Sequence, residues 1–420
     1  MDRPHPEPGA LVRLAAGELS GTALAAVLTH LSGCAPCGAR FGAAALARAA
    51  APAGGAVPAR TYEEAVRRAV SRAAGPARRV RQERRATEPG LTFLLQLPAR
   101  ERSDTVRASP MLRSYTLARE CLARSRQAWF DDPARGDELA ALSLHVAGHL
   151  SSRTYGSAVL EDLRAEAWCH LANARRIRSD HAGAADAFGW AEEHRRAGTG
   201  DPAELAAYSG LYSTYLRERD DLEGARAHLD QTIALHRRAG SRHLEARALL
   251  SLSILERRGG KFDLAMSLLH RAAGGLDPGR EPRLTRAIAK NRILFLADRG
   301  ARPDVTRALA ALDPGQELTR LDRLRTLWAR GVVLAKLEQP DRAESALLAA
   351  QRGFVRARIP QDVALLDLDL ARLYLGTGRR DEARARATTA LPTFAARGLQ
   401  RDLLDALDLF RRAGGLAASS

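Results

Sequence analysis

From about residue 111 the sequence repeats a two-helix pattern with a period of about 40 residues. Each unit has an apolar helical stretch, a turn with Gly, Asp or Pro, and then an alanine at a fixed offset that opens a second helix. These alanines are Ala184, Ala225, Ala265, Ala343 and Ala383, with a weaker unit near Val305. A helix pair cannot bury its apolar face alone, so pairs stack, with alanine where two axes approach closely. The period predicts an all-α fold, an α-solenoid of helix pairs.

The packing positions of these units resemble those of the tetratricopeptide repeat (TPR) family. The match is carried by Trp168, Leu171, Ala172, Ala184, Phe188 and Ala191, and its second half recurs as Ala265, Leu269 and Ala272. The resemblance covers residues 111–413, with a loosely fitting first pair around Ala140, and implies an array that binds protein partners. The usual TPR period is about 34 residues, so these helices should be longer by about one turn.

Glycines and an amphipathic C-terminal stretch mark the ends of the units. The glycines Gly240, Gly260, Gly300 and Gly378 are expected at helix ends, where a left-handed backbone is least unfavourable for glycine. Residues 401–414, RDLLDALDLFRRAG, are expected to form a helix that caps the array at residue 413, followed by a disordered tail at 414–420.

A second distinctive feature is the clustering of His30, Cys34 and Cys37 near the N-terminus of a chain with four cysteines. A CxxC pair alone is compatible with a metal site, a redox pair or coincidence. The added histidine supplies a third soft or borderline ligand across one turn region. Tetrahedral zinc requires a fourth.

His5 supplies that fourth ligand if the N-terminal helices form a hairpin. Apolar spacing predicts two short helices, over residues 8–19 and 21–31. Antiparallel packing places the start of the first helix beside the end of the second, so His5 meets His30. The predicted zinc ligands are His5, His30, Cys34 and Cys37.

This arrangement resembles the zinc-binding anti-sigma family, whose small helical domain has a His about 25 residues before an HxxxCxxC motif. His5, Gly17-Glu18-Leu19, His30, Cys34 and Cys37 match that pattern over residues 5–41. The resemblance implies that residues 1–42 form a zinc-binding module that binds a sigma factor. Two thiolates and two imidazoles close the coordination shell, which favours a structural zinc. Oxidation of the thiolates to a disulfide with loss of metal is the alternative.

The segment between the two features, residues 43–110, is expected to be a linker followed by a basic helical region. Residues 43–59 are rich in Ala, Gly and Pro and are typical of a linker. Residues 60–85 are strongly basic and helical in pattern, with a break at Gly75-Pro76. A short apolar helix between them and residue 110 completes the region.

The formal net charge of +16 raises the question of nucleic-acid binding. Of the 65 basic residues 62 are arginine, which GC-rich codons also favour, so a solvated basic surface is the simpler interpretation. The sequence contains no phosphate-binding loop, serine-hydrolase or zinc-protease motif, and we expect no catalysis. Its lack of a long apolar run or an apolar leader predicts a cytoplasmic protein that does not bind membranes.

Three successive units carry an arginine eight residues before the alanine, namely Arg176, Arg217 and Arg257. In the proteins that the array resembles, this part of the first helix lines the concave side. Stacking about 10 Å apart would set three guanidinium groups in a row. Because each guanidinium can bind a carboxylate through two hydrogen bonds, the row predicts a groove for an acidic peptide or protein surface.

Together these features predict a non-enzymatic regulatory or adaptor protein. The zinc head would occlude a partner such as an extracytoplasmic-function sigma factor, and the array would receive a signal or a second partner. One alternative is a TPR scaffold or adaptor subunit of a larger effector assembly, with a purely structural zinc head. A further alternative is nucleic-acid binding through residues 60–85.

Overall fold

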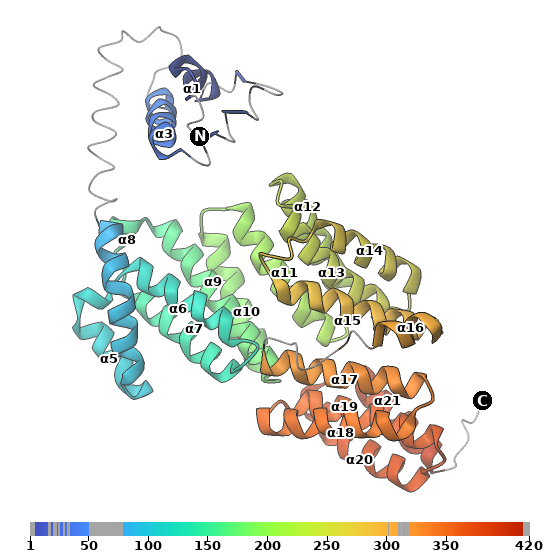
Figure 1. The fold of residues 1–420 in the computed structure, drawn as a ribbon. Helices are drawn as coiled ribbons and strands as arrows, with labels where there is room; N and C mark the ends of the chain where they lie inside the picture. Colours follow the sequence, from blue (N-terminus) through green and yellow to red (C-terminus); the bar gives the residue numbers. More distant parts are fainter. Residues whose placement is uncertain are drawn as a thin grey trace. The chain divides into compact units, whose positions relative to one another are not determined.

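The computed structural model describes residues 5–15, 18–19, 23, 26–27, 30–31, 34–49, 79–300, 302–309, 312 and 319–414. These residues belong to two compact units, Met1–Ala86 and Thr87–Ser420. Every regular element within the described ranges is a helix (Figure 1), which confirms the predicted all-α fold. Gly17 of the predicted head motif, residues 50–78 of the predicted linker and basic region, and the predicted tail at 415–420 lie outside the described residues.

The head is built from α1 (Pro8–Ala15) and α3 (Ala35–Ala49), which pack against each other. The described residues of the second predicted helix, 23, 26–27 and 30–31, are helical as well. Residues 43–49 continue α3, so the predicted linker does not begin at residue 43. The reason is the alanine-rich sequence of this stretch, because alanine has the highest helix propensity and no proline interrupts it.

Helix pairs make up the second unit, and Figure 1 shows them following one another along the chain. The two helices of each pair pack against each other, and the second helix of the pair α15 and α16 has only 8 residues. The paired helices are α6 (Tyr115–Ala128) and α7 (Pro133–Gly148), α9 (Ser157–Ile177) and α10 (His181–Ala197), α11 (Pro202–Glu218) and α12 (Leu222–Arg238), α13 (Arg242–Arg258) and α14 (Phe262–Gly275), α15 (Pro282–Asp298) and α16 (Arg302–Leu309), α17 (Arg320–Lys336) and α18 (Pro340–Ala357), and α19 (Pro360–Gly376) and α20 (Arg380–Arg397). The last helix is α21 (Gln400–Ala413), as the sequence predicts, and α8 (Ser152–Tyr155) is a single turn. In the described part of the chain, no helix is both long and apolar enough to span a bilayer.

The alanines that defined the period are all fully buried, each near the start of the second helix of its pair. Ala140 in the loosely fitting first pair is fully buried too. Val305 occupies the equivalent place in α16 and is also buried. It is larger than alanine, and α16 is the shortest second helix among the described pairs. The predicted close approach at these positions is therefore confirmed.

In six of the seven described pairs, all but that of α6 and α7, the turn between the two helices contains one residue in the left-handed conformation. Gly260, Gly300 and Gly378 occupy this place with positive φ, and Gly240 does so in a turn between pairs, as predicted. In three other pairs the same place holds a residue with a side chain, namely Ser179, Asp220 and Glu338. This conformation costs about 1–2 kcal/mol for an L-residue, so those side chains must serve another purpose.

The array begins earlier than residue 111. Residues 79–96 are helical and are followed by α5 (Ala99–Ala108) and the single 3₁₀ turn η1 (Pro110–Leu112). Leu91, Leu94 and Val106 are fully buried in one apolar cluster with side chains of α6, α7 and α9. Residues 87–110 thus cover the open end of the first long pair, which would otherwise expose its apolar face.

The array also folds back, so that α17 contacts the turn between α6 and α7. The backbone N–H of Leu321 donates to the carbonyl oxygen of Phe130 at 3.0 Å, and the N–H of Arg320 donates to Asp131 at 2.7 Å. Trp129 of the same turn is buried in one cluster with residues of α17, α18 and α19. An apolar contact therefore joins helices almost 200 residues apart in the sequence.

Candidate functional site

The four predicted metal ligands lie together at one end of the head. His5 precedes α1, His30 is helical, Cys34 directly precedes α3 and Cys37 lies in its first turn. One donor atom from each residue falls in a group whose members are all within 4.8 Å of one another. The Nδ1 atom of His5 is 3.3 Å from Nε2 of His30, 3.5 Å from Sγ of Cys34 and 3.3 Å from Sγ of Cys37.

These distances fit a tetrahedral zinc ion. Zinc–sulfur bonds of about 2.3 Å and zinc–nitrogen bonds of about 2.0–2.1 Å place tetrahedral donors roughly 3.3–3.8 Å apart. All three separations from the His5 nitrogen fall in this range. Thiolate and imidazole donors also select zinc over magnesium or calcium, which prefer oxygen. The residues present therefore fit a closed, structural zinc site.

The other two cysteines have a different environment. Cys121 and Cys169 are buried in the array, on α6 and α9. Burial raises the pKa of the Cys121 thiol to about 12, and it raises the pKa of Cys169 as well. Because a thiol that stays protonated is a poor ligand and nucleophile, both residues pack as small apolar side chains.

Two of the three predicted partner-binding arginines are already held in ion pairs between successive helix pairs. Arg176 pairs with Glu218 of α11 and also donates to Asn173 at 2.9 Å. Arg257 pairs with Asp298 of α15, which Lys336 of α17 contacts too. We call this series of contacts the ladder. Its guanidinium groups stabilise the stacking of the array.

Arg217 is the exception in the predicted row. The equivalent position in the next helix pair holds Arg258, a second cation, whereas Arg176 and Arg257 each have a carboxylate there. Among the described residues Arg217 has neither an ion-pair nor a hydrogen-bond partner. Burial lowers the pKa of Arg217 to about 10; Glu218 raises it, whereas Arg176, Arg258 and Arg325 lower it further. Arg217 is thus a half-buried cation whose charged neighbours are mainly other cations.

Sequence reasoning missed the residues that face the predicted row, although a signal for them exists. The residues seven positions before Ala225, Ala265, Val305 and Ala343 alternate in charge along the array: Glu218, Arg258, Asp298 and Lys336. This column supplies the partners of the ladder and explains why Arg217 lacks one.

Asp362, in the first turn of α19, is a half-buried carboxylate near the same arginines. Burial raises the pKa of Asp362 to about 6, although Arg325 lowers it, and Glu218 adds to the rise. No hydrogen bond or ion pair joins this carboxylate to another described residue. Sequence reasoning did not single it out, because a first-turn aspartate is common at helix N-termini.

We expect Asp362→Asn to stabilise the array at pH 7 by up to about 3 kcal/mol, because the pKa is raised by about two units and one unit corresponds to about 1.4 kcal/mol. The raised pKa means that folded Asp362 holds its proton above the unfolded pKa of about 4, so wild-type stability falls as the pH rises from about 4 to 6. Urea unfolding should show the gain at pH 7 and none at pH 4. Asp341→Asn, at an exposed first-turn position of α18, is the control. Equal stability of the Asp362 variant and the wild type at pH 7 would contradict the expectation.

No protein-family model matches the sequence, and no curated protein matches it. Among solved structures, the chain is similar to yeast Tom70, with 13% identity over 97% of this chain and 86% of that chain and a TM-score of 0.42. It is similar to aspartyl phosphate phosphatase F from Bacillus subtilis, with 9% identity over 97% of this chain and 93% of that chain and a TM-score of 0.32. It is also similar to the Cut9–Hcn1 hetero-tetramer of APC/C, with 14% identity over 75% of this chain and a TM-score of 0.38; there it spans only 58% of the matched chain.

Proposed function

We propose that this chain is a non-enzymatic adaptor whose head holds one zinc ion and whose array binds protein partners. The observation that carries the proposal is the convergence of four zinc-type donor atoms within 4.8 Å in a compact unit of its own. A small unit with few buried side chains needs such a cross-link to fold. The ion would be held by His5, His30, Cys34 and Cys37 and would supply structure and no reaction.

The partner that we propose for the head is a sigma factor of the extracytoplasmic-function class. Support comes from the resemblance of His5, Glu18-Leu19, His30, Cys34 and Cys37 to the anti-sigma motif. In this mechanism the folded head covers a surface that the sigma factor needs for transcription. The zinc ion acts indirectly, because it keeps the helices of the head in place.

For the array we propose a partner with an acidic surface or an acidic peptide segment. Of the three arginines in the predicted row, Arg217 supports this proposal, since Arg176 and Arg257 already have carboxylate partners within the chain. A half-buried guanidinium without a carboxylate partner loses part of its hydration, and a carboxylate from a partner would relieve that cost.

Affinity capture from the native host, followed by mass spectrometry, tests the role of the head. We expect a sigma factor to be captured by the wild type and by Cys121→Ala/Cys169→Ala, but not by Cys34→Ala/Cys37→Ala. The two double variants make the same chemical change, one in the array and one in the head. Retention of the sigma factor by both, or its absence from every sample, would contradict the sigma-factor proposal. Capture of enzyme or effector subunits by the wild type and by both double variants would favour the scaffold alternative.

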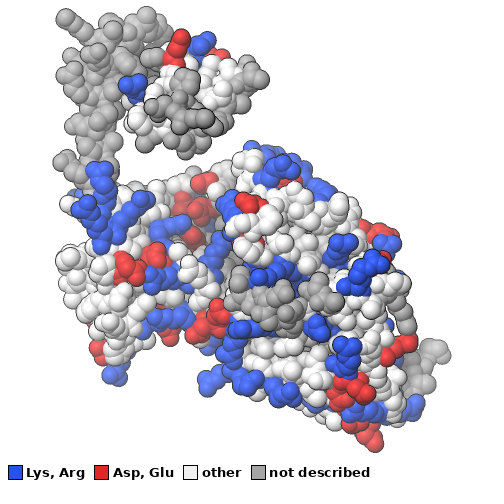
Figure 2. Space-filling model, in the orientation of Figure 1, with Lys and Arg blue, Asp and Glu red and all other residues white. Residues whose placement is uncertain are grey.

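Nucleic-acid binding is a second candidate, favoured by the basic start of the helix over residues 79–96. Arg79, Arg81, Arg84 and Arg85 are exposed there. On the face of the molecule drawn in Figure 2, acidic side chains are interspersed with the basic ones of the array, which does not favour the array itself as a nucleic-acid surface. Duplex DNA should be retained in a strongly salt-dependent way if this candidate holds, and neutralising these four arginines should reduce the salt dependence.

A further inference from the structure

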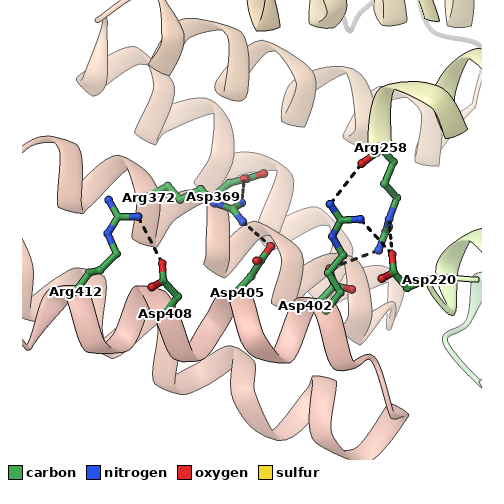
Figure 3. A network of polar contacts seen from close by, with 9 residues as sticks. Asp220, Arg258, Asp369, Arg372, Asp402, Asp405, Asp408 and Arg412 are labelled. Atoms are coloured by element: carbon green, nitrogen blue, oxygen red, sulfur yellow. Dashed lines mark hydrogen bonds and ion pairs between the residues drawn. The ribbon is translucent and has the colours of Figure 1, made fainter. Parts of the chain in front are cut away.

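We propose that Asp220, Arg258, Arg401 and Asp402 form a clasp that closes the array on itself and excludes an acidic partner from Arg217 and Arg258. The clasp joins the turn after α11 and the end of α13 to the start of α21. Figure 3 shows Arg258 and Asp220 facing Asp402 of α21. The part that concerns the partner rests on the proposed function of the array, whereas the closure itself does not.

The contacts of the clasp alternate in charge. Nε of Arg258 is 3.4 Å from Asp220, and Nη2 of Arg258 is 3.8 Å from Asp402. Nη1 of Arg401 is 3.3 Å from Asp220, and Nη2 of Arg401 donates to the carbonyl oxygen of Arg258 at 3.4 Å. Two cations and two anions thus neutralise one another across segments that are 143 to 181 residues apart.

A polar seam continues the clasp toward α10 and α19. Nε of Arg397 donates to the carbonyl oxygen of Ser179 at 3.0 Å, and the N–H of Gln361 donates to the Ser179 hydroxyl at 3.3 Å. A cavity of about 610 Å³ lies along this seam, with residues of α10 and its preceding turn, α11 and α20 in its wall. Polar, loosely packed contacts of this kind resemble interfaces between movable domains more than a protein core.

Two turns at this seam hold residues with side chains in a backbone conformation that favours glycine. Ser179 and Asp220 are two of the four described non-glycine residues that adopt the left-handed conformation. Glycine at the equivalent places, such as Gly260 and Gly378, avoids the cost of about 1–2 kcal/mol. The hydroxyl of Ser179 and the carboxylate of Asp220 both make contacts across the seam, which accounts for retaining them.

Closure and partner binding compete for the same guanidinium. Arg258 stands at the ladder position opposite Arg217, but its side chain is engaged by Asp220 and Asp402. Its Nε atom is buried and, although Asp220 lies 3.4 Å away, makes no hydrogen bond to a described residue, so the closed arrangement does not fully satisfy it. When the clasp opens, Arg217 and Arg258 together offer two cations to a partner carboxylate. Asp220 and Asp402 therefore occupy the place of the acidic partner.

Hydrogen exchange of the α21 amides tests the closure. Arg401→Glu places a negative charge beside Asp220 and Asp402, and we expect exchange in α21 to become about fivefold to tenfold faster. The double variant Asp220→Arg/Arg401→Glu restores opposite charges between these two positions but places a cation beside Arg258, so it should restore slow exchange in part. Arg412→Glu makes the same change on the same helix, where its partner Asp408 is also on α21, and should leave exchange unchanged (Figure 3). In the unmodified wild type, salt at about 0.5 M should screen the ion pairs of the clasp and so speed exchange of the α21 amides.

Equal exchange rates in Arg401→Glu, in Arg412→Glu and in the wild type at both salt concentrations would overturn the clasp. Binding of a hexaglutamate peptide tests the competition separately. We expect Asp402→Asn to bind it at least fivefold more tightly than the wild type, and Arg217→Gln to abolish the gain. Faster exchange without any gain in peptide affinity would confirm the closure and overturn the competition, together with the acidic partner of the array.

Discussion

Replacing Cys34 and Cys37 with alanine is expected to abolish zinc binding and unfold the head, while the array keeps its helices. Structural zinc supplies about 10–16 kcal/mol of apparent binding free energy in small zinc domains. Among the described head residues only Leu11, Val27, Cys37 and Ala44 are buried, so little else stabilises the unit. The wild type should contain about one zinc per chain by elemental analysis, and the variant none. Proteolysis should then cleave the variant within residues 1–49 and spare residues 115–413.

The matched control is Cys121→Ala/Cys169→Ala. These thiols are buried in the array, so their loss should leave the zinc content unchanged. Negligible metal in a wild-type preparation from zinc-supplemented cells would contradict the metal site. Zinc retained by the Cys34→Ala/Cys37→Ala variant would show that the ligands are other residues.

The Phe354→Ala substitution is expected to destabilise the array by about 3–5 kcal/mol, the usual effect of removing a buried phenylalanine. Phe354 of α18 is fully buried, and its ring lies 6.1 Å from that of Trp328 in an edge-on arrangement. It belongs to the cluster that also contains Trp129, so the cavity would weaken the contact between α17 and the turn after α6. Urea unfolding monitored by circular dichroism measures the change.

Val355→Ala provides the control for this substitution, because the neighbouring side chain is 58% exposed. We expect it to change the free energy of unfolding by less than about 0.5 kcal/mol. A loss below about 1 kcal/mol for Phe354→Ala would mean that the cluster repacks. Such an outcome would contradict a tightly packed contact around Phe354.

The local features of this chain are readable from its sequence because they depend on neighbouring residues. Buried Ala184 and Ala265 and the left-handed turn at Gly260 follow from the geometry of one helix pair. The grouping of His5 with Cys34 follows from a hairpin of two short helices. The fold class and the grouping of these four side chains could therefore be predicted before the structure was known, while zinc binding itself stays a prediction.

Features that depend on the accumulated rotation of many helix pairs could not be predicted. The contact of Arg401 with Asp220 requires the array to turn back on itself, and that path is the sum of small rotations between successive pairs. The ion pair of Arg176 was not predicted for a simpler reason. Its partner Glu218 lies in the following helix pair, whereas the repeat pattern describes one pair at a time. Residues 87–110, which the prediction assigned to the region before the array, contribute Leu91, Leu94 and Val106 to one apolar cluster with the first helix pairs.

The return of the array onto itself gives an all-α chain an unusually non-local topology. In an open solenoid every contact lies within one unit or its neighbour, and such proteins have low contact order and fold quickly. Here Gln361 contacts Ser179, 182 residues away, and Arg320 contacts Asp131, 189 residues away. The entropy of closing loops of this length must be lost before those contacts form. Individual helix pairs should therefore form early and the joining of the distant segments late, so that docking limits the folding rate.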